Sequence, residues 1–175
     1  MIDEIFKTFF YKSKIDLTKL KYTTNDKPRL AYSTKTLRKD NLIFENKDYL
    51  NSILNKGVYS LMNSYNQKFA FNIKITGIWE HEYINNDFQE DHVHFNWHFS
   101  FIIYYKGRGS TVFKNPHGYH LQSMYSKFDN YLGGYEYSPE LEQGDLVIFP
   151  SILPHYVKKQ SNTKTISGDL LLVRL

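Results

Sequence analysis

Histidine side chains gather in one short part of the sequence, and two of them are spaced so that they can share a ligand. Four of the seven histidines fall within residues 81–98, and His92 and His94 stand two apart in a stretch predicted to be a β-strand. Residues i and i+2 of a strand project from the same face, so both imidazoles can reach one ion. This spacing predicts a site for a divalent metal.

A third ligand must come from a distant part of the chain, and His155 is the best candidate. It follows an apolar run at 145–149 and a loop bounded by Pro150 and Pro154. Proline fixes the backbone angle φ, so the loop is restricted and would present His155 in a fixed direction. Together with the strand pair above, His155 predicts a three-histidine metal centre.

The residue types limit what else the site can contain. The chain has no cysteine, which excludes disulfides and thiolate ligands and leaves imidazole and oxygen donors. Taken singly, His81, His98, His117 and His120 are expected to be ordinary polar residues of an aromatic-rich protein.

The spacing of apolar residues divides the chain into two parts. Over residues 48–66 the apolar positions follow a helical period, and the segment beginning at Asn46 offers a cap. From Phe69 the period becomes two, and strands are expected at 69–80, 90–94, 98–106, 110–113, 145–149, 154–158 and 164–174. The pattern predicts a mainly β fold with N-terminal helices, organised as a double-stranded β-helix (jelly roll).

We expect a single domain over residues 1–175, because this length suits one core and is short for two domains. Residues 1–68 are expected to form a helical lead and support, and residues 69–175 the jelly-roll core. A polar and aromatic loop insertion at 114–138 interrupts the core. Loops of this length often serve as lids or bind substrate, so we expect specificity to be determined there.

Composition limits the class of protein. The net charge of +4 comes from lysines scattered along the chain, which indicates a solvated surface more than a nucleic-acid footprint. No apolar run approaches the roughly 20 residues that span a bilayer, and the first residues lack the features of a signal peptide. We therefore expect a cytoplasmic protein without membrane association, in the host-cell cytoplasm if it is viral. The sequence does not identify a substrate, which can be a small molecule, a protein or a nucleic acid, nor an oligomeric state.

Three stretches of the sequence carry a resemblance to a known family. They are W-E-H-E-Y-I-N-N-D-F-Q-E-D-H-V-H-F-N-W-H-F-S-F-I-I-Y-Y at 79–105, G-D-L-V-I-F-P-S-I-L-P-H-Y-V at 144–157 and T-K-T-I-S-G-D-L-L-L at 163–172. These stretches resemble the 2-oxoglutarate- and iron(II)-dependent oxygenases common in phage and marine bacterial genomes. The resemblance implies a hydroxylase-type dioxygenase with iron(II) as its metal and 2-oxoglutarate as its cosubstrate.

The family's ligand pattern differs from this sequence at one position. Its iron is bound by an H-x-D/E pair and a distal histidine, and a basic residue beyond that histidine pairs with the far carboxylate of 2-oxoglutarate. Here His94 occupies the acidic position, so either the site has three histidines or Asp91 or Asn96 supplies an oxygen. The resemblance assigns the basic role to Lys164, with Lys106 as the alternative.

Polar residues on the strand at 98–106 complete the predicted pocket. Ser100 and Tyr104 lie on the same strand face as His98, because alternate residues of a strand share a face. We predict that Ser100 and Tyr104 hydrogen-bond to the cosubstrate, and that Asn96, His98 and Lys106 are additional candidates for the site.

Two other classes of protein fit the same residues. A cupin enzyme would bind its metal through His92, His94, His98 and His155 and would need no 2-oxoglutarate. A non-catalytic jelly-roll module, structural or carbohydrate-binding, would carry the same histidines without a tightly bound metal. Metal binding separates this third class from the two enzymes, and 2-oxoglutarate binding separates the oxygenase from the cupin.

Overall fold

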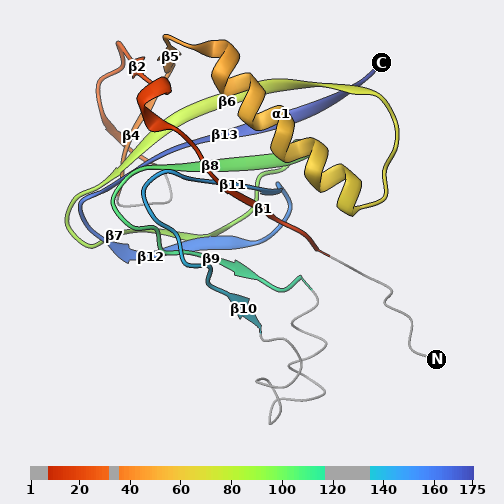
Figure 1. Ribbon diagram of the computed structural model, residues 1–175. Helices are drawn as coiled ribbons and strands as arrows, with labels where there is room; N and C mark the ends of the chain where they lie inside the picture. The colour runs from red at the N-terminus through yellow and green to blue at the C-terminus, as the bar shows by residue number, and fades with distance from the viewer. Residues whose placement is uncertain (1–7, 32–35, 117–134) are drawn as a thin grey trace.

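A computed structural model describes residues 8–31, 36–116 and 135–175, and within these ranges it is mostly β-sheet with one α-helix (Figure 1). The helix is α1 (Lys47–Ser64), and a short 3-10 turn covers Leu17–Lys19. The strands are β1 (Tyr11–Lys14), β2 (Tyr22–Thr23), β3 (Arg29–Leu30), β4 (Leu37–Asp40), β5 (Ile43–Phe44), β6 (Phe71–Tyr83), β7 (Asp87–His92), β8 (Phe99–Lys106), β9 (Thr111–Lys114), β10 (Glu136–Tyr137), β11 (Asp145–Pro150), β12 (His155–Gln160) and β13 (Thr163–Arg174).

The described strands form antiparallel sheets. The larger sheet has seven strands in the order β1-β11-β8-β13-β6-β4-β3, a second has four in the order β10-β9-β12-β7, and β2 pairs with β5. Figure 1 shows α1 crossing one side of the seven-stranded sheet, with the four-stranded sheet on the other side. The seven-stranded sheet is therefore the central layer, and the predicted mainly β fold is confirmed.

Helix α1 forms where the sequence predicts it. The side chain of Asn46 accepts a hydrogen bond from the backbone N–H of Tyr49, which satisfies one of the free donors of the first turn. The apolar stripe of α1, which includes Leu50, Leu54 and Val58, is buried against the large sheet. No helix in the described ranges has the length and apolar character required to cross a bilayer.

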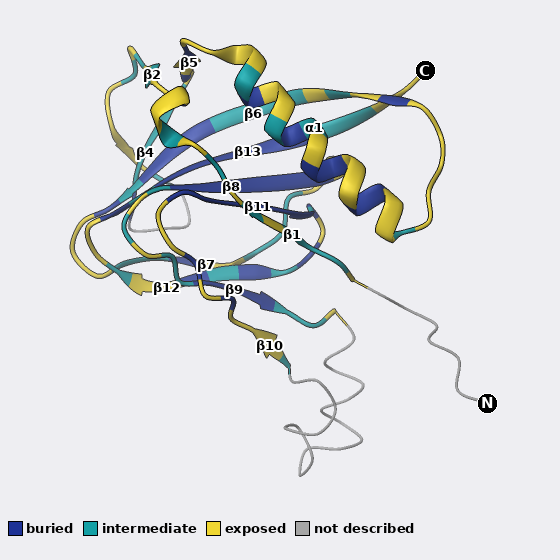
Figure 2. Ribbon diagram, viewed as in Figure 1, coloured by how far each residue is buried: buried dark blue, intermediate teal, exposed yellow. Residues whose placement is uncertain are grey.

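Strand β8 separates two cores because its side chains alternate between the two faces of the sheet. Phe101 and Ile103 pack into the core beneath α1, whereas Ile102 and Tyr104 pack into a second core that includes Phe113 of the four-stranded sheet. The strand is consequently buried along most of its length, as Figure 2 shows. A strand buried on both faces explains the near-continuous apolar run at 99–105.

The N-terminal part contains more β structure than the sequence predicts. The described residues between 8 and 44 include the five short strands β1 to β5. The α-helix α1 follows them. Strands of two to four residues are too short to show a period of two. Their structure follows from pairing instead: β1 pairs with β11, β4 pairs with β6 and β3, and β2 pairs with β5. Of the insertion expected at 114–138, residues 117–134 lie outside the described residues, and β10 forms near its end.

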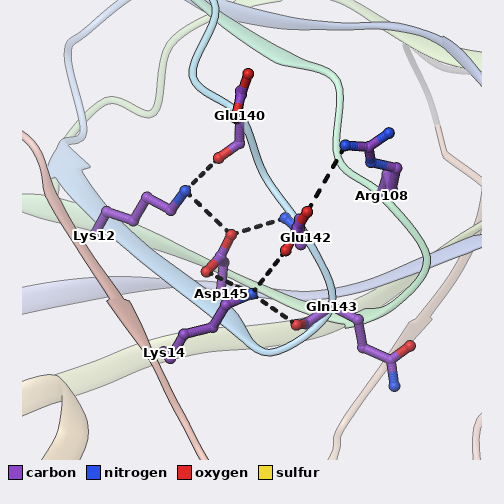
Figure 3. Close-up of polar contacts among 7 residues, drawn as sticks. All are labelled: Lys12, Lys14, Arg108, Glu140, Glu142, Gln143 and Asp145. Atoms are coloured by element: carbon purple, nitrogen blue, oxygen red, sulfur yellow. Dashed lines mark hydrogen bonds and ion pairs between the residues drawn. The ribbon is translucent and has the colours of Figure 1, made fainter.

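A buried carboxylate attaches β1 to the edge of the large sheet (Figure 3). Asp145 accepts a hydrogen bond from the backbone N–H of Glu142 at 2.8 Å, and the Nζ atoms of Lys12 and Lys14 lie 3.3 and 3.1 Å from its oxygens. Burial raises the pKa of this carboxyl, but the Glu142 N–H and the two lysines outweigh that effect. The pKa of Asp145 is therefore lower than its ordinary value in the folded protein.

Replacing Asp145 by Asn should lower the free energy of unfolding at pH 7 by about 1–3 kcal/mol, because a buried charge that faces two lysines is lost. The folded pKa lies below the unfolded one, so the contribution is complete above the unfolded value and disappears as the pH falls through the folded value. Urea unfolding of both proteins should therefore give a difference that shrinks below about pH 4. Glu142→Gln, an exposed control, should change stability by less than about 0.5 kcal/mol. A difference independent of pH would contradict the role of the charge.

Candidate metal centre

A cavity of about 170 Å³ is lined by residues from both the seven-stranded and the four-stranded sheet. Three histidines, His92, His94 and His155, line it together with Arg38, Trp79, His81, Ser100, Phe149 and Ser167. Ligand pockets for drug-sized molecules measure roughly 300–1,000 Å³, so this cavity suits a smaller molecule.

The three predicted ligands come together at one place. His92 ends β7 and His155 begins β12, and the two residues are direct partners in the strand pairing. One ligand atom from each of His92, His94 and His155 lies within 4.8 Å of the other two. Ligands of one ion lie a little closer together, so small rotations of the side chains would bring all three nitrogens onto a single metal.

His94 reaches the cluster by a different route from the one predicted. Strand β7 ends at His92, so His94 lies in the segment that follows and does not share a strand face with it. The backbone N–H of His94 donates to the carbonyl of Ser151 at 2.8 Å, and Ser151 N–H donates to the carbonyl of His98. These hydrogen bonds hold the segment after β7 against the loop that precedes His155.

Each imidazole is oriented through its Nδ1 atom. Nδ1 lies 2.6 Å from the carbonyl oxygen of Glu90 in His92, and 2.9 Å from that of Leu153 in His155. Carbonyl oxygens only accept hydrogen bonds, so these nitrogens carry the proton. In His94, Nδ1 lies 2.7 Å from Oδ1 of Asp169. With Nδ1 engaged in each ring, Nε2 is the atom that each histidine can offer to a metal, as is usual for metal-binding histidines.

Burial keeps His92 and His155 uncharged at neutral pH. His155 is 3% exposed, and burial together with the nearby His92 lowers its pKa to about 3. Burial also lowers the pKa of His92, partly offset by the Glu90 carbonyl. Neutral imidazole is the form that binds metals, so these two ligands need not lose a proton when an ion enters at neutral pH.

Asp169, which was not among the residues predicted for the site, contacts the histidine cluster directly. It lies on β13 opposite Ser100 of β8, whose hydroxyl donates to the same oxygen that faces His94. The carboxyl is thereby held toward the histidine cluster. A signal was present in the sequence: Thr165, Ser167 and Asp169 place a polar residue at every second position, and Ser167 of this face lines the cavity.

The alternative ligands considered above lie outside the cluster. Asp91 forms an ion pair with Lys114, and Asn96 is exposed with a positive φ of 71°. His98 is exposed, and its Nδ1 accepts a hydrogen bond from the backbone N–H of Leu172. Within the described residues, the donor set is therefore three imidazoles without a carboxylate. Such a set fits a borderline divalent transition metal such as iron(II).

The structure does not bring the predicted basic residue to the cavity. The Nζ atom of Lys164 lies 3.5 Å from Glu80, and Glu80 stands between two cavity residues, Trp79 and His81, along β6. Alternate residues of a strand point to opposite faces, so Glu80 and its partner Lys164 lie on the other side of the sheet. Lys106, the fallback, is the exposed strand partner of Lys164.

The two predicted hydrogen-bonding residues have different locations. Ser100 lines the cavity, hydrogen-bonded to Asp169 and lying 2.9 Å from the hydroxyl of Ser151. Tyr104 is buried in the core between the sheets, where its hydroxyl lies 2.6 Å from that of Thr111. Ser100 thus lines the cavity, although its hydroxyl is engaged by Asp169 and Ser151, whereas Tyr104 lies away from the cavity in the core.

No protein-family model matches the chain, and no curated protein matches its sequence. In structure, it resembles an oxidoreductase of the 2OG-Fe(II) oxygenase family from Burkholderia pseudomallei, with a TM-score of 0.53 and 12% identity over 88% of this chain and 74% of that one. A Pseudomonas putida prolyl-4-hydroxylase gives a TM-score of 0.52 and 14% identity over 85% of this chain and 78% of that one. A viral collagen prolyl hydroxylase from Paramecium Bursaria Chlorella virus-1, in complex with 2OG, gives 0.48 and 10%, with 79% of each chain covered. At these identities, the first two comparisons show that the chain shares a fold with 2OG-Fe(II) oxygenase proteins.

Removing the carboxylate that faces His94 should weaken metal binding without abolishing it. Calorimetric titration with iron(II) under anaerobic conditions should show an affinity about 10–100-fold lower for Asp169→Asn, the usual loss when a partner of a ligating histidine is replaced. His155→Ala should lose the site altogether. His98→Ala is the control and should bind within about twofold of the original protein. An unchanged affinity in Asp169→Asn would mean that His94 is oriented by other contacts.

Proposed function

We propose that this protein is a double-stranded β-helix (jelly-roll) oxygenase that uses iron(II) and 2-oxoglutarate to oxidise a substrate still to be identified. The observation that carries the proposal is the convergence of three imidazoles, with one ligand atom of each within 4.8 Å of the others and each Nδ1 facing an oxygen atom. The fold shared with 2OG-Fe(II) oxygenase proteins supports it.

The charge of the ligand set favours an acidic cosubstrate. Three neutral imidazoles leave the double positive charge of a bound ion uncompensated by its direct ligands, so an anionic chelator gains attraction there. The small cavity beside the histidines suits a short organic acid. Bound together, iron(II) and 2-oxoglutarate would supply the activation of O₂, in which the oxo acid is converted to succinate and CO₂ and one oxygen atom enters a C–H bond of the substrate.

The protein's own residues would position the reactants and exclude water. The Phe149 ring lies 4.8 Å from that of His155 in an edge-on arrangement, and Trp79 stacks against His94 at 5.8 Å. These rings cover the ligands with apolar surface, which strengthens electrostatic interactions inside the cavity. Ser100 and Ser167 supply polar groups to the cavity wall.

One observation favours a second candidate function. The ligand cluster has three histidines and no carboxylate, which suits a metal enzyme of the cupin type that works without 2-oxoglutarate. The fourth ligand of that candidate would be His98, whose Nδ1 is occupied by the N–H of Leu172. The oxygenase is therefore the better supported of the two.

Anaerobic titration of the metal-free protein with iron(II) and then 2-oxoglutarate tests the proposal. Chelation of iron by the keto acid produces a visible charge-transfer absorption band, which should appear in the original protein and be absent in His155→Ala. His98→Ala should keep the band, because His98 lies outside the histidine cluster.

Each other result has a definite meaning. Iron binding without a band, for any keto acid tried, would favour the metal enzyme that needs no 2-oxoglutarate. Failure to bind iron at all would remove both enzyme functions and leave a non-catalytic module.

A further inference from the structure

The cavity wall contains a cationic side chain that the histidine cluster does not account for. Arg38 lines the cavity from β4, a strand that precedes the histidine segments by some fifty positions or more and pairs with β6 near the edge of the large sheet (Figure 1). Among the described residues that line this cavity, Arg38 is the one with a permanent positive charge, and none is Asp or Glu. An anion entering the cavity would therefore find both the histidine cluster and a guanidinium in its wall.

The guanidinium is held in place by two contacts. It lies over the Trp79 ring, with its central carbon 4.4 Å from the ring centroid. Its Nε donates to Oδ1 of Asp40 at 2.8 Å, and Nη2 lies 2.7 Å from the same oxygen. Because Trp79 also stacks against His94, Arg38 and a metal ligand contact the same indole.

The fixed guanidinium still has hydrogen bonds to offer. Arginine carries five N–H donors, and Asp40 engages the side formed by Nε and Nη2. The end of the fork, formed by Nη1 and the second N–H of Nη2, is not used by Asp40 and has the geometry that binds a carboxylate through two parallel bonds. Arg38 can therefore pair with an incoming carboxylate without releasing Asp40.

The charges around Arg38 leave a positive excess. Arg29 approaches the other oxygen of Asp40 at 2.7 Å, so two guanidinium groups share one carboxylate. His81, the direct strand partner of Arg38, is buried, and burial followed by the charge of Arg38 lowers its pKa to about 3. His81 is therefore neutral, and Arg38 is the group that can balance an anion in this part of the cavity.

We propose that Arg38 binds the far carboxylate of a dicarboxylic 2-oxo acid whose keto-acid end lies at the three histidines. This inference rests on the proposed function and names the residue that selects the cosubstrate. It places the anchor on an N-terminal strand, whereas the sequence resemblance had assigned it to Lys164 on β13. Lys164 is committed to Glu80 on the opposite face of the sheet, so the two assignments predict different effects of substitution.

Two keto acids of equal carbon number distinguish the assignments. 2-Oxoglutarate and 2-oxopentanoate chelate iron through the same groups, but 2-oxopentanoate lacks the far carboxylate. Anaerobic titration of the iron(II)-loaded protein, followed by the charge-transfer band, should give an affinity about tenfold or more higher for 2-oxoglutarate, the gain expected from a charge-assisted pair. In Arg38→Met this preference should disappear, while the affinity for 2-oxopentanoate should stay within about twofold.

Two further variants serve as controls. Lys164→Met should keep the full preference, because its side chain faces away from the cavity. Arg38→Lys retains the charge but not the forked guanidinium, so it should show an intermediate preference for 2-oxoglutarate. This result would show that the loss of preference in Arg38→Met comes from the missing charge and not from a general disturbance of the cavity. Thermal unfolding of each variant establishes that the compared proteins are folded.

The outcomes separate this inference from the proposed function. A preference that persists in Arg38→Met, or that disappears in Lys164→Met, would overturn the assignment of Arg38 while leaving the oxygenase intact. Equal affinity of the original protein for both acids would also overturn it. If neither acid gives a band in the original protein, the proposed function fails, and the assignment fails with it.

Discussion

The hydrogen bond between His94 and Asp169 ties one of the three imidazoles to the seven-stranded sheet, whereas the other two belong to the four-stranded sheet. His92 and His155 are strand partners within the four-stranded sheet, so backbone pairing sets their separation. His94 belongs to neither sheet, and its ring is held at 2.7 Å by Asp169 of β13, in the middle of the seven-stranded sheet. The distance between the two sheets therefore determines how far His94 lies from His92 and His155. The aromatic core between the sheets, in which the Phe113 and Phe149 rings lie 4.9 Å apart, is for that reason part of the metal site.

The elements of the core could be predicted because burial imposes regular spacing. Strands β6, β8, β11 and β13 have long buried faces, and their alternation was visible at 69–80 and 164–174 within two or three residues of the observed bounds. Helix α1 was visible from its apolar stripe and from the cap at Asn46. The three histidines were recognisable from their residue type and their clustering, although His94 does not lie on the predicted strand.

The remainder of the site depends on facts that local pattern does not contain. A shift of one residue along β13 moves a side chain to the other face, which is why Lys164 was assigned to the cavity although Ser167, on the opposite face, is the β13 residue that lines it. Strand β4 has four residues and no period, and Arg38 reaches the cavity because β4 pairs with β6 far along the chain. Contacts of this kind become visible only when strand order and register are known.

The strand partnership of His92 and His155 has a consequence beyond chemistry. Strand β7 lies at the edge of the four-stranded sheet, and its pairing with β12 contains register shifts, so this part of the sheet has few regular hydrogen bonds to hold it. An ion bound by both residues would act as a cross-link between strands and would add its binding energy to that of folding. The supply of that ion would then affect the lifetime of the protein in the cell as well as its activity. Without the ion, the pairing of β7 with β12 would open more often and the protein would be degraded sooner.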